Sequence, residues 1–185
     1  MIQCGRTKGN QQTIHQVIPT SPVPVSSPLL VLTVDPHGCA DRARQLAHSL
    51  NIPIVGVPPP DALVLRLGEQ RLELYKPGDS DLPRSLWVDF DSTTARRRSR
   101  HPGKELLIQA AKVRKPVQPL LIDATAGLGR DGVLLATAGF RVLMIECNPV
   151  IAALLDDGLR RARQMEALAP IAARSHLLTG NALEY

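Results

Sequence analysis

A chain of 185 residues, 44% hydrophobic and 3% aromatic, has room for one ordinary domain with an aliphatic core, or for one domain with a small appendage. No apolar run approaches the ~20 residues that span a bilayer, and no secretory signal is present. The three cysteines are scattered and have neither metal-ligand spacing nor a disulfide pattern. These features together indicate a cytoplasmic protein without a bound metal. The formal net charge of +5 is compatible with a polyanionic partner.

The first part of the chain predicts a leader, a small lobe and a linker. Residues 1–28 are rich in proline and polar residues and have no hydrophobic periodicity, which indicates a disordered leader. Residues 29–95 predict a small α+β lobe, with a strand over 29–34, a helix over 39–50, a β-hairpin over 63–67 and 71–75, and a short strand over 86–90. Residues 96–104 are expected to form a basic linker.

Helices and strands alternate over residues 105–185. The expected elements are a helix over 105–115, a strand over 119–123, a helix over 130–138, a strand over 141–146, a helix over 150–165 and a strand over 176–179. This alternation is typical of a parallel sheet with right-handed crossovers. The predicted fold class is therefore α/β, with a Rossmann-like parallel sheet preceded by the small lobe.

A glycine-rich turn follows the strand that ends in Asp123. The segment Gly127-Leu-Gly-Arg-Asp-Gly132 has the spacing G-x-G-x-x-G between a strand and a helix, which is the setting of a nucleotide cofactor. Glu146 ends the next strand, where a carboxylate can accept hydrogen bonds from both hydroxyls of a ribose. The loop after the third strand lies beside the adenine in such sheets, which makes Asn181 a candidate for the adenine edge.

The position of Asp123 distinguishes between two cofactors. In the dinucleotide fingerprint the strand runs almost directly into the first glycine, and an anion between them disfavours a pyrophosphate. An anion there suits the ammonium and sulfonium groups of S-adenosylmethionine, and Arg130 and Asp131 are placed to meet the carboxylate and amine of that cofactor. S-adenosylmethionine is the favoured ligand, with NAD(P) or a turn without a ligand as the alternatives.

Three motifs together resemble the RsmJ family. They are Asp123-Ala-Thr-Ala-Gly-Leu-Gly-Arg-Asp131, then Glu146-x-Asn-Pro-Val150, and then Ala152-Ala-Leu-Leu-Asp-Asp-Gly-Leu159. RsmJ proteins are S-adenosylmethionine-dependent methyltransferases that modify N2 of a guanine in small-subunit (16S) ribosomal RNA. The resemblance covers roughly residues 29–185 and is closest over 120–159. Residues and resemblance together give these candidate cofactor contacts: Asp123, Gly127, Gly129, Arg130, Asp131, Glu146, Cys147, Asn181 and Ala182.

The family's base-binding motif has no counterpart in this sequence. The family carries an Asp-Pro-Met-Phe-Pro type motif after a further strand, whereas the only Asp-Pro here is Asp35-Pro36, in the first lobe. We therefore assign no catalytic residue and expect a truncated form. In such a form the strand over 119–123 has an unpaired apolar edge, and we expect the chain alone to fold poorly and not to methylate. The alternatives are a non-catalytic cofactor- or RNA-binding remnant and a dehydrogenase-like nucleotide domain.

A cluster of cationic residues lies between the two halves of the chain. A cluster of this kind can neutralise RNA phosphates, and the resemblance favours that role over a solvated linker. The candidate RNA-binding residues are Arg96, Arg97, Arg98, Arg100 and Lys104. The expected partner is therefore ribosomal RNA of the small subunit.

Overall fold

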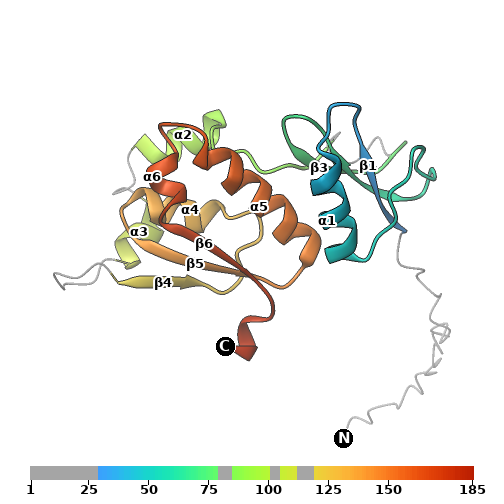
Figure 1. Cartoon of the computed structure of the whole chain (residues 1–185). Helices are drawn as coiled ribbons and strands as arrows, with labels where there is room; N and C mark the ends of the chain where they lie inside the picture. Colours follow the sequence, from blue (N-terminus) through green and yellow to red (C-terminus); the bar gives the residue numbers. More distant parts are fainter. Residues whose placement is uncertain (1–28, 79–84, 101–104, 112–118) are drawn as a thin grey trace, which may run out of the picture.

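The computed structural model describes residues 29–78, 85–100, 105–111 and 119–185, and in these ranges the strands form two three-stranded sheets (Figure 1). The predicted leader over 1–28 and Lys104 lie outside the described residues, as does the side chain of Arg100. The second half of the chain forms the predicted α/β arrangement, so the expected fold class is confirmed.

The first sheet contains a parallel pair of strands. Its elements are β1 (Leu30–Val34), α1 (Ala40–Leu50), β2 (Leu63–Leu67) and β3 (Leu72–Tyr75). β1 pairs with β2 in parallel across the α1 crossover, and β2 pairs with β3 as the expected antiparallel hairpin. The short strand expected over 86–90 is reduced to one bridge, between Leu86 and Leu74.

A helix occupies part of the segment that was expected to be a linker. α2 (Thr93–Arg100) begins after Ser92, whose Oγ accepts a hydrogen bond from the backbone N–H of Ala95 at 3.3 Å. Arg96 on α2 pairs with Asp91 just before the helix, at 2.6 Å. A capped start and a run of arginines, which are good helix formers, explain why these residues are helical.

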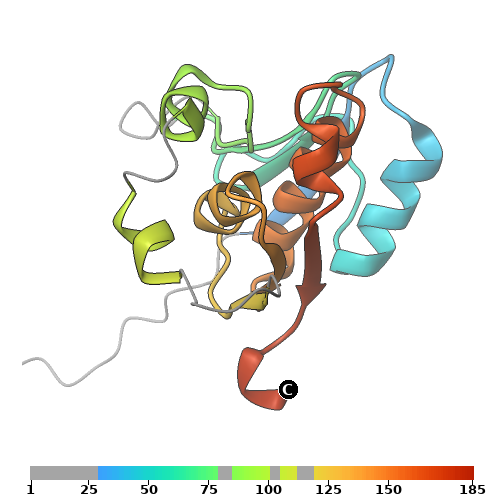
Figure 2. The same cartoon turned by 90° about the vertical axis from the view of Figure 1, so that its left-hand side faces the viewer.

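The second sheet is parallel, with the order β4-β5-β6. Its elements are α3 (Leu106–Ala111), β4 (Leu120–Asp123), α4 (Arg130–Thr137), β5 (Arg141–Glu146), α5 (Pro149–Arg163), α6 (Ala169–Ala172), β6 (Ser175–Thr179) and the 3-10 turn η2 (Ala182–Glu184). In the turned view α2 and α3 stand beside α4, on the side away from α1 (Figure 2). Helix α6 and the turn η2 were not predicted, and the end of the helix expected over 105–115 lies outside the described residues beyond Ala111. The other bounds fall within a few residues of expectation.

One aliphatic core runs through both halves of the chain. Leu32, Leu65 and Leu72 from the first sheet belong to the same buried cluster as Leu154 and Leu159 from α5. Helix α5 therefore packs on the second sheet and also contacts β3 and α1. The small lobe and the parallel sheet are joined by this shared core.

A buried carboxylate on α5 connects the two halves. The side chain of Asp157, which is 2% exposed, accepts a hydrogen bond from Nη2 of Arg42 on α1 at 2.6 Å. It also accepts from the backbone N–H of Leu72 at 3.1 Å and from Nε of Arg161 at 2.9 Å. At Gly158, an added Cβ would lie 2.3 Å from Cγ1 of Val88, so the small lobe approaches α5 too closely for a side chain.

A second buried carboxylate gives the small lobe a pH dependence. Glu73 on β3 is 4% exposed and faces Arg66 on β2, whose Nε donates to its Oε1 at 2.6 Å. Burial raises the pKa of Glu73, but the hydrogen bond from Arg66 and the charges of Arg66 and Arg71 outweigh burial and hold that pKa below its ordinary value of 4.5.

We expect acid to weaken the small lobe through Glu73. Because its folded pKa is lowered, its stabilisation is complete above pH 4.5 and is lost as the pH falls through the lowered value. Denaturant unfolding at several pH values measures this loss, and Glu73→Gln should flatten the acid limb of the stability curve. An acid limb as steep in Glu73→Gln as in the wild type would assign the loss to other groups.

Candidate functional site

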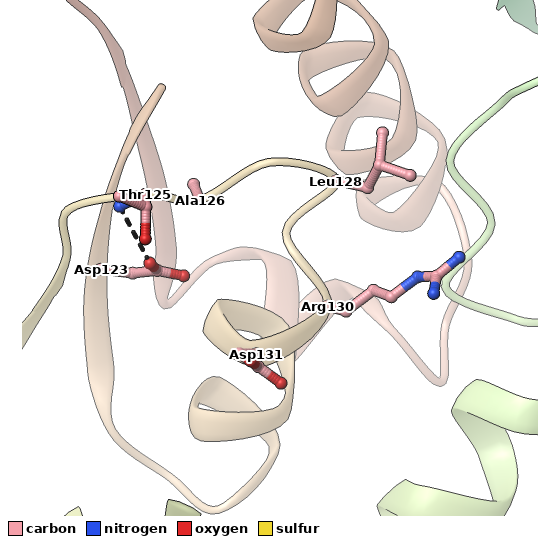
Figure 3. Close-up of a pocket in the computed structure, with 6 residues that line it drawn as sticks. All are labelled: Asp123, Thr125, Ala126, Leu128, Arg130 and Asp131. Atoms are coloured by element: carbon pink, nitrogen blue, oxygen red, sulfur yellow. Dashed lines mark hydrogen bonds between the residues drawn. The ribbon is translucent and has the colours of Figure 1, made fainter. Parts of the chain in front are cut away.

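A polar pocket of about 310 Å³ opens beside the carboxyl end of β4 (Figure 3). The pocket is lined by Asp123, Thr125, Ala126, Leu128, Arg130 and Asp131. Ligands of open parallel sheets bind at this edge, outside the carboxyl ends of the strands. The sequence predicted the three charged lining residues and missed Thr125, Ala126 and Leu128, which carry no distinctive chemistry.

The pocket contains two carboxylates and one guanidinium. Asp123 is held in a local turn, in which its Oδ1 accepts a hydrogen bond from the N–H of Thr125 at 3.3 Å. Asp131 lies on the first turn of α4, and Arg130 extends away from Asp123 (Figure 3). The carboxylate of Asp123 suits a positively charged group of a ligand, such as an ammonium or a sulfonium. The same charge disfavours a pyrophosphate.

The glycine loop before α4 requires glycine for two different reasons. Gly127 and Gly129 have φ angles of 53° and 72°, in the left-handed region that other residues rarely adopt. At Gly132 the reason is space, since an added Cβ would lie 2.4 Å from Sδ of the buried Met144 on β5. The first two glycines therefore shape the loop, and the third lets α4 pack closely on β5.

Glu146 holds this loop from the end of β5. Its Oε2 accepts a hydrogen bond from the N–H of Gly127 at 2.7 Å, and its Oε1 accepts one from the N–H of Asn148 at 2.8 Å. The residue is 8% exposed and is not among the residues that line the pocket. The structure thus gives Glu146 a bracing role that the sequence did not reveal, and its predicted contact with a ribose stays a prediction.

We expect Glu146→Gln to loosen the glycine loop. The amide keeps the shape of the side chain but turns an NH2 group toward one of the two backbone N–H donors. Losing one charged hydrogen bond costs about 1.5–3 kcal/mol, so the free energy of unfolding should fall by an amount in this range. Denaturant unfolding measures the change. A variant as stable as the wild type would show that Glu146 does not brace the loop.

The remaining predicted cofactor residues lie along the same edge of the sheet. The N–H of Gly180 donates to the carbonyl of Glu146 at 2.9 Å, which places the ends of β5 and β6 side by side. Asn181 caps η2, because its Oδ1 accepts a hydrogen bond from the N–H of Leu183 at 3.1 Å. Cys147 is exposed. Contact of Cys147, Asn181 and Ala182 with a cofactor stays a prediction.

The basic segment is partly engaged within the protein. Arg96 pairs with Asp91, whereas the side chain of Arg97 is exposed on α2. Nη2 of Arg98 lies 3.2 Å from both Oε2 of Glu105 and Oδ1 of Asp131, a residue of the pocket. The hydrogen bond to Glu105, which has the larger effect, and the hydrogen bond to Asp131 raise the pKa of Arg98, whereas burial lowers it. The sequence predicted Arg98 as a phosphate ligand and did not predict its contact with the pocket.

A family model described as "Putative SAM-dependent methyltransferase" matches residues 46–185, which is most of the chain. The chain belongs to this family. Curated relatives named "Ribosomal RNA small subunit methyltransferase J" include one from Pseudomonas aeruginosa strain LESB58, which is 42% identical over 149 residues, 80% of this chain and 56% of the relative. One from Nitrosococcus oceani is 43% identical over 151 residues, 78% of this chain and 58% of the relative. The resemblance seen in the motifs is confirmed.

A solved structure supports the same assignment of the fold. The SAM-dependent methyltransferase from Neisseria gonorrhoeae has a TM-score of 0.65 and 31% identity to this chain. The match covers 83% of this chain and 61% of that protein. The chain therefore spans a little over half the length of the curated relatives that it matches.

Two of the motifs that carry the resemblance to the methyltransferase family have clear structural roles here. In Glu146-x-Asn-Pro, Oδ1 of Asn148 caps α5 by accepting from the N–H groups of Val150 and Ile151, and Pro149 occupies the first helical position. In the Asp-Asp-Gly motif, the buried Asp157 and Gly158 contact the small lobe. The first motif orders the loop beside the pocket, and the second fixes the small lobe against the sheet.

The described part of this methyltransferase family member offers neither a membrane-spanning helix nor a clustered metal site. None of its described helices has both the length and the apolar character needed to cross a membrane. Within the same residues, no group of three or more histidine, cysteine, aspartate or glutamate side chains is placed to hold a metal ion.

Proposed function

We propose that this chain binds S-adenosylmethionine in the pocket at the end of β4 and serves the methylation of the N2 amine of a guanine in small-subunit ribosomal RNA. The observation that carries the proposal is the carboxylate of Asp123 beside a glycine loop at the carboxyl edge of a parallel sheet. The names of the curated relatives support ribosomal RNA as the substrate class. A ribosomal RNA substrate supports a location in the cytoplasm.

Several residues of this chain would hold S-adenosylmethionine, each at a different group of the cofactor. When bound, the cofactor supplies a methyl group that is electrophilic because it is attached to a sulfonium. Asp123 and Asp131 pair with the positive groups of the cofactor, and Arg130 pairs with its carboxylate. Glu146 braces the loop that forms the pocket. The protein's contribution to the reaction is to hold the donor in line with the acceptor amine and to exclude water.

A titration tests the choice of cofactor. We expect the folded chain to bind S-adenosylmethionine and to show no comparable affinity for NADH, because the carboxylate of Asp123 disfavours a pyrophosphate. Isothermal titration calorimetry with each ligand measures the two dissociation constants. A preference for NADH would overturn the assignment and favour a dehydrogenase-like domain.

The open edge of β4 favours a second candidate function. In this candidate the chain binds S-adenosylmethionine but does not transfer its methyl group. Within the described residues β4 pairs only with β5, and Leu120 and Ile122 are 52% and 63% exposed. An open strand edge with apolar side chains invites association. On this account the purified chain binds S-adenosylmethionine and does not label a ribosomal RNA transcript with tritiated methyl groups. Clear incorporation of the label would rule this second candidate out.

A further inference from the structure

One arginine links the basic segment to the cofactor pocket. Arg98 projects from α2, and its guanidinium lies between Glu105 and Asp131, at 3.2 Å from each carboxylate. Its side chain is 31% exposed, whereas that of Asp131 is 62% exposed. Helices α2 and α3 both pack against α4, which carries Asp131 (Figure 2). The contact therefore spans from the basic segment to the pocket.

The neighbouring arginines of α2 do not share this position. Arg96 forms its ion pair with Asp91, before the helix, at 2.6 Å. Arg97 is exposed, and Arg98 is half-buried. Of the arginine side chains described on α2, Arg98 is the one with a contact to a residue that lines the pocket.

We propose that Arg98 couples RNA binding to cofactor binding through Asp131. The proposal rests on the proposed function. In the free protein the guanidinium of Arg98 neutralises Asp131. An ammonium group that binds Oδ1 of Asp131 competes with Arg98 for that atom, and an RNA phosphate that binds Arg98 releases Asp131. Both ligands break the ion pair between Arg98 and Asp131, which costs free energy. The ligand that binds first breaks the pair, so the second ligand binds without that cost.

The coupling has a definite sign, size and salt dependence. RNA tightens the binding of the cofactor, and by thermodynamic reciprocity the cofactor tightens the binding of RNA by the same factor. A partly exposed ion pair of this kind corresponds to about a threefold to fivefold change in affinity. High ionic strength screens exposed charges, so the factor shrinks toward one as salt is added.

Calorimetric titration of the full 185-residue chain with S-adenosylmethionine, with and without a saturating small-subunit ribosomal RNA transcript, tests the proposal. We expect the transcript to tighten cofactor binding about threefold to fivefold in the wild type. The factor should fall to about one in Arg98→Gln and in Asp131→Asn, and part of it should return in Arg98→Lys. Arg97→Gln is the matched control. It should weaken RNA binding and, at saturating RNA, keep the wild-type factor.

The outcomes separate this proposal from the proposed function. If S-adenosylmethionine does not bind at all, the proposed function fails and the coupling fails with it. If both ligands bind to the wild type without affecting each other, only the coupling is overturned. The coupling through Arg98 is also overturned if RNA tightens cofactor binding in Arg98→Gln by the same factor as in the wild type. In that case the tightening would arise from the general charge of the RNA.

Discussion

Replacing Asp157 by alanine should destabilise the folded chain by about 3–5 kcal/mol, the range measured when one partner of a buried ion pair is removed. The side chain is 2% exposed, and its carboxylate is shared by Arg42, Arg161 and the backbone N–H of Leu72. Its removal leaves these donors without their acceptor in the contact between α5 and the small lobe. Denaturant unfolding followed by circular dichroism measures the loss.

The chain offers a matched control one residue away. Asp156 is exposed on the same helix, so Asp156→Ala should change the free energy of unfolding by no more than about 0.5 kcal/mol. Similar losses in the two variants would show that the effect comes from the charge of α5 and not from the buried network. Asp157→Asn, which keeps the shape of the side chain, should lie between Asp157→Ala and the wild type.

Replacing Asp123 by asparagine should weaken S-adenosylmethionine binding about 10- to 100-fold. Asparagine keeps an oxygen that can accept the hydrogen bond from the N–H of Thr125, so the turn is retained while the charge is lost. A charged hydrogen bond in a pocket contributes about 1.5–3 kcal/mol, which corresponds to the expected change in affinity. Calorimetric titration of the folded variant measures it.

Asp156→Asn serves as the control for Asp123→Asn, since it removes a carboxylate from an exposed helix position that does not line the pocket. Its affinity should match that of the wild type. An unchanged affinity in Asp123→Asn would show that this carboxylate does not pair with the cofactor. In that case Asp131 would be the remaining acidic residue of the pocket.

The glycine loop and the strands around it were predictable because their signals are local. The strand over 141–146 has the same bounds in the structure, since its apolar run is bounded by a turn on each side. The glycine spacing predicted the turn, and two of the three glycines do have positive φ angles. Asp123 was predicted at a strand end and lies there.

Contacts between distant segments could not be read from local patterns. The parallel pairing of β1 with β2 depends on a crossover that the alternation of residues does not specify. The Asp-Asp-Gly motif was visible as a signature, but the partner of Asp157 at Leu72 is 85 residues away in sequence. The contact of Arg98 with Asp131 spans 33 residues, and the sequence predicted Arg98 only as a ligand of RNA phosphates.

Chemical-shift mapping tests the central claim most directly, because a chain of 20.1 kDa is suited to amide NMR. S-adenosylmethionine should shift the amides of Thr125, Gly127 and Asp131, around the pocket, while NADH at the same concentration leaves them in place. Shifts confined to residues away from the end of β4, or the same shifts caused by NADH, would contradict the assignment of this pocket to S-adenosylmethionine.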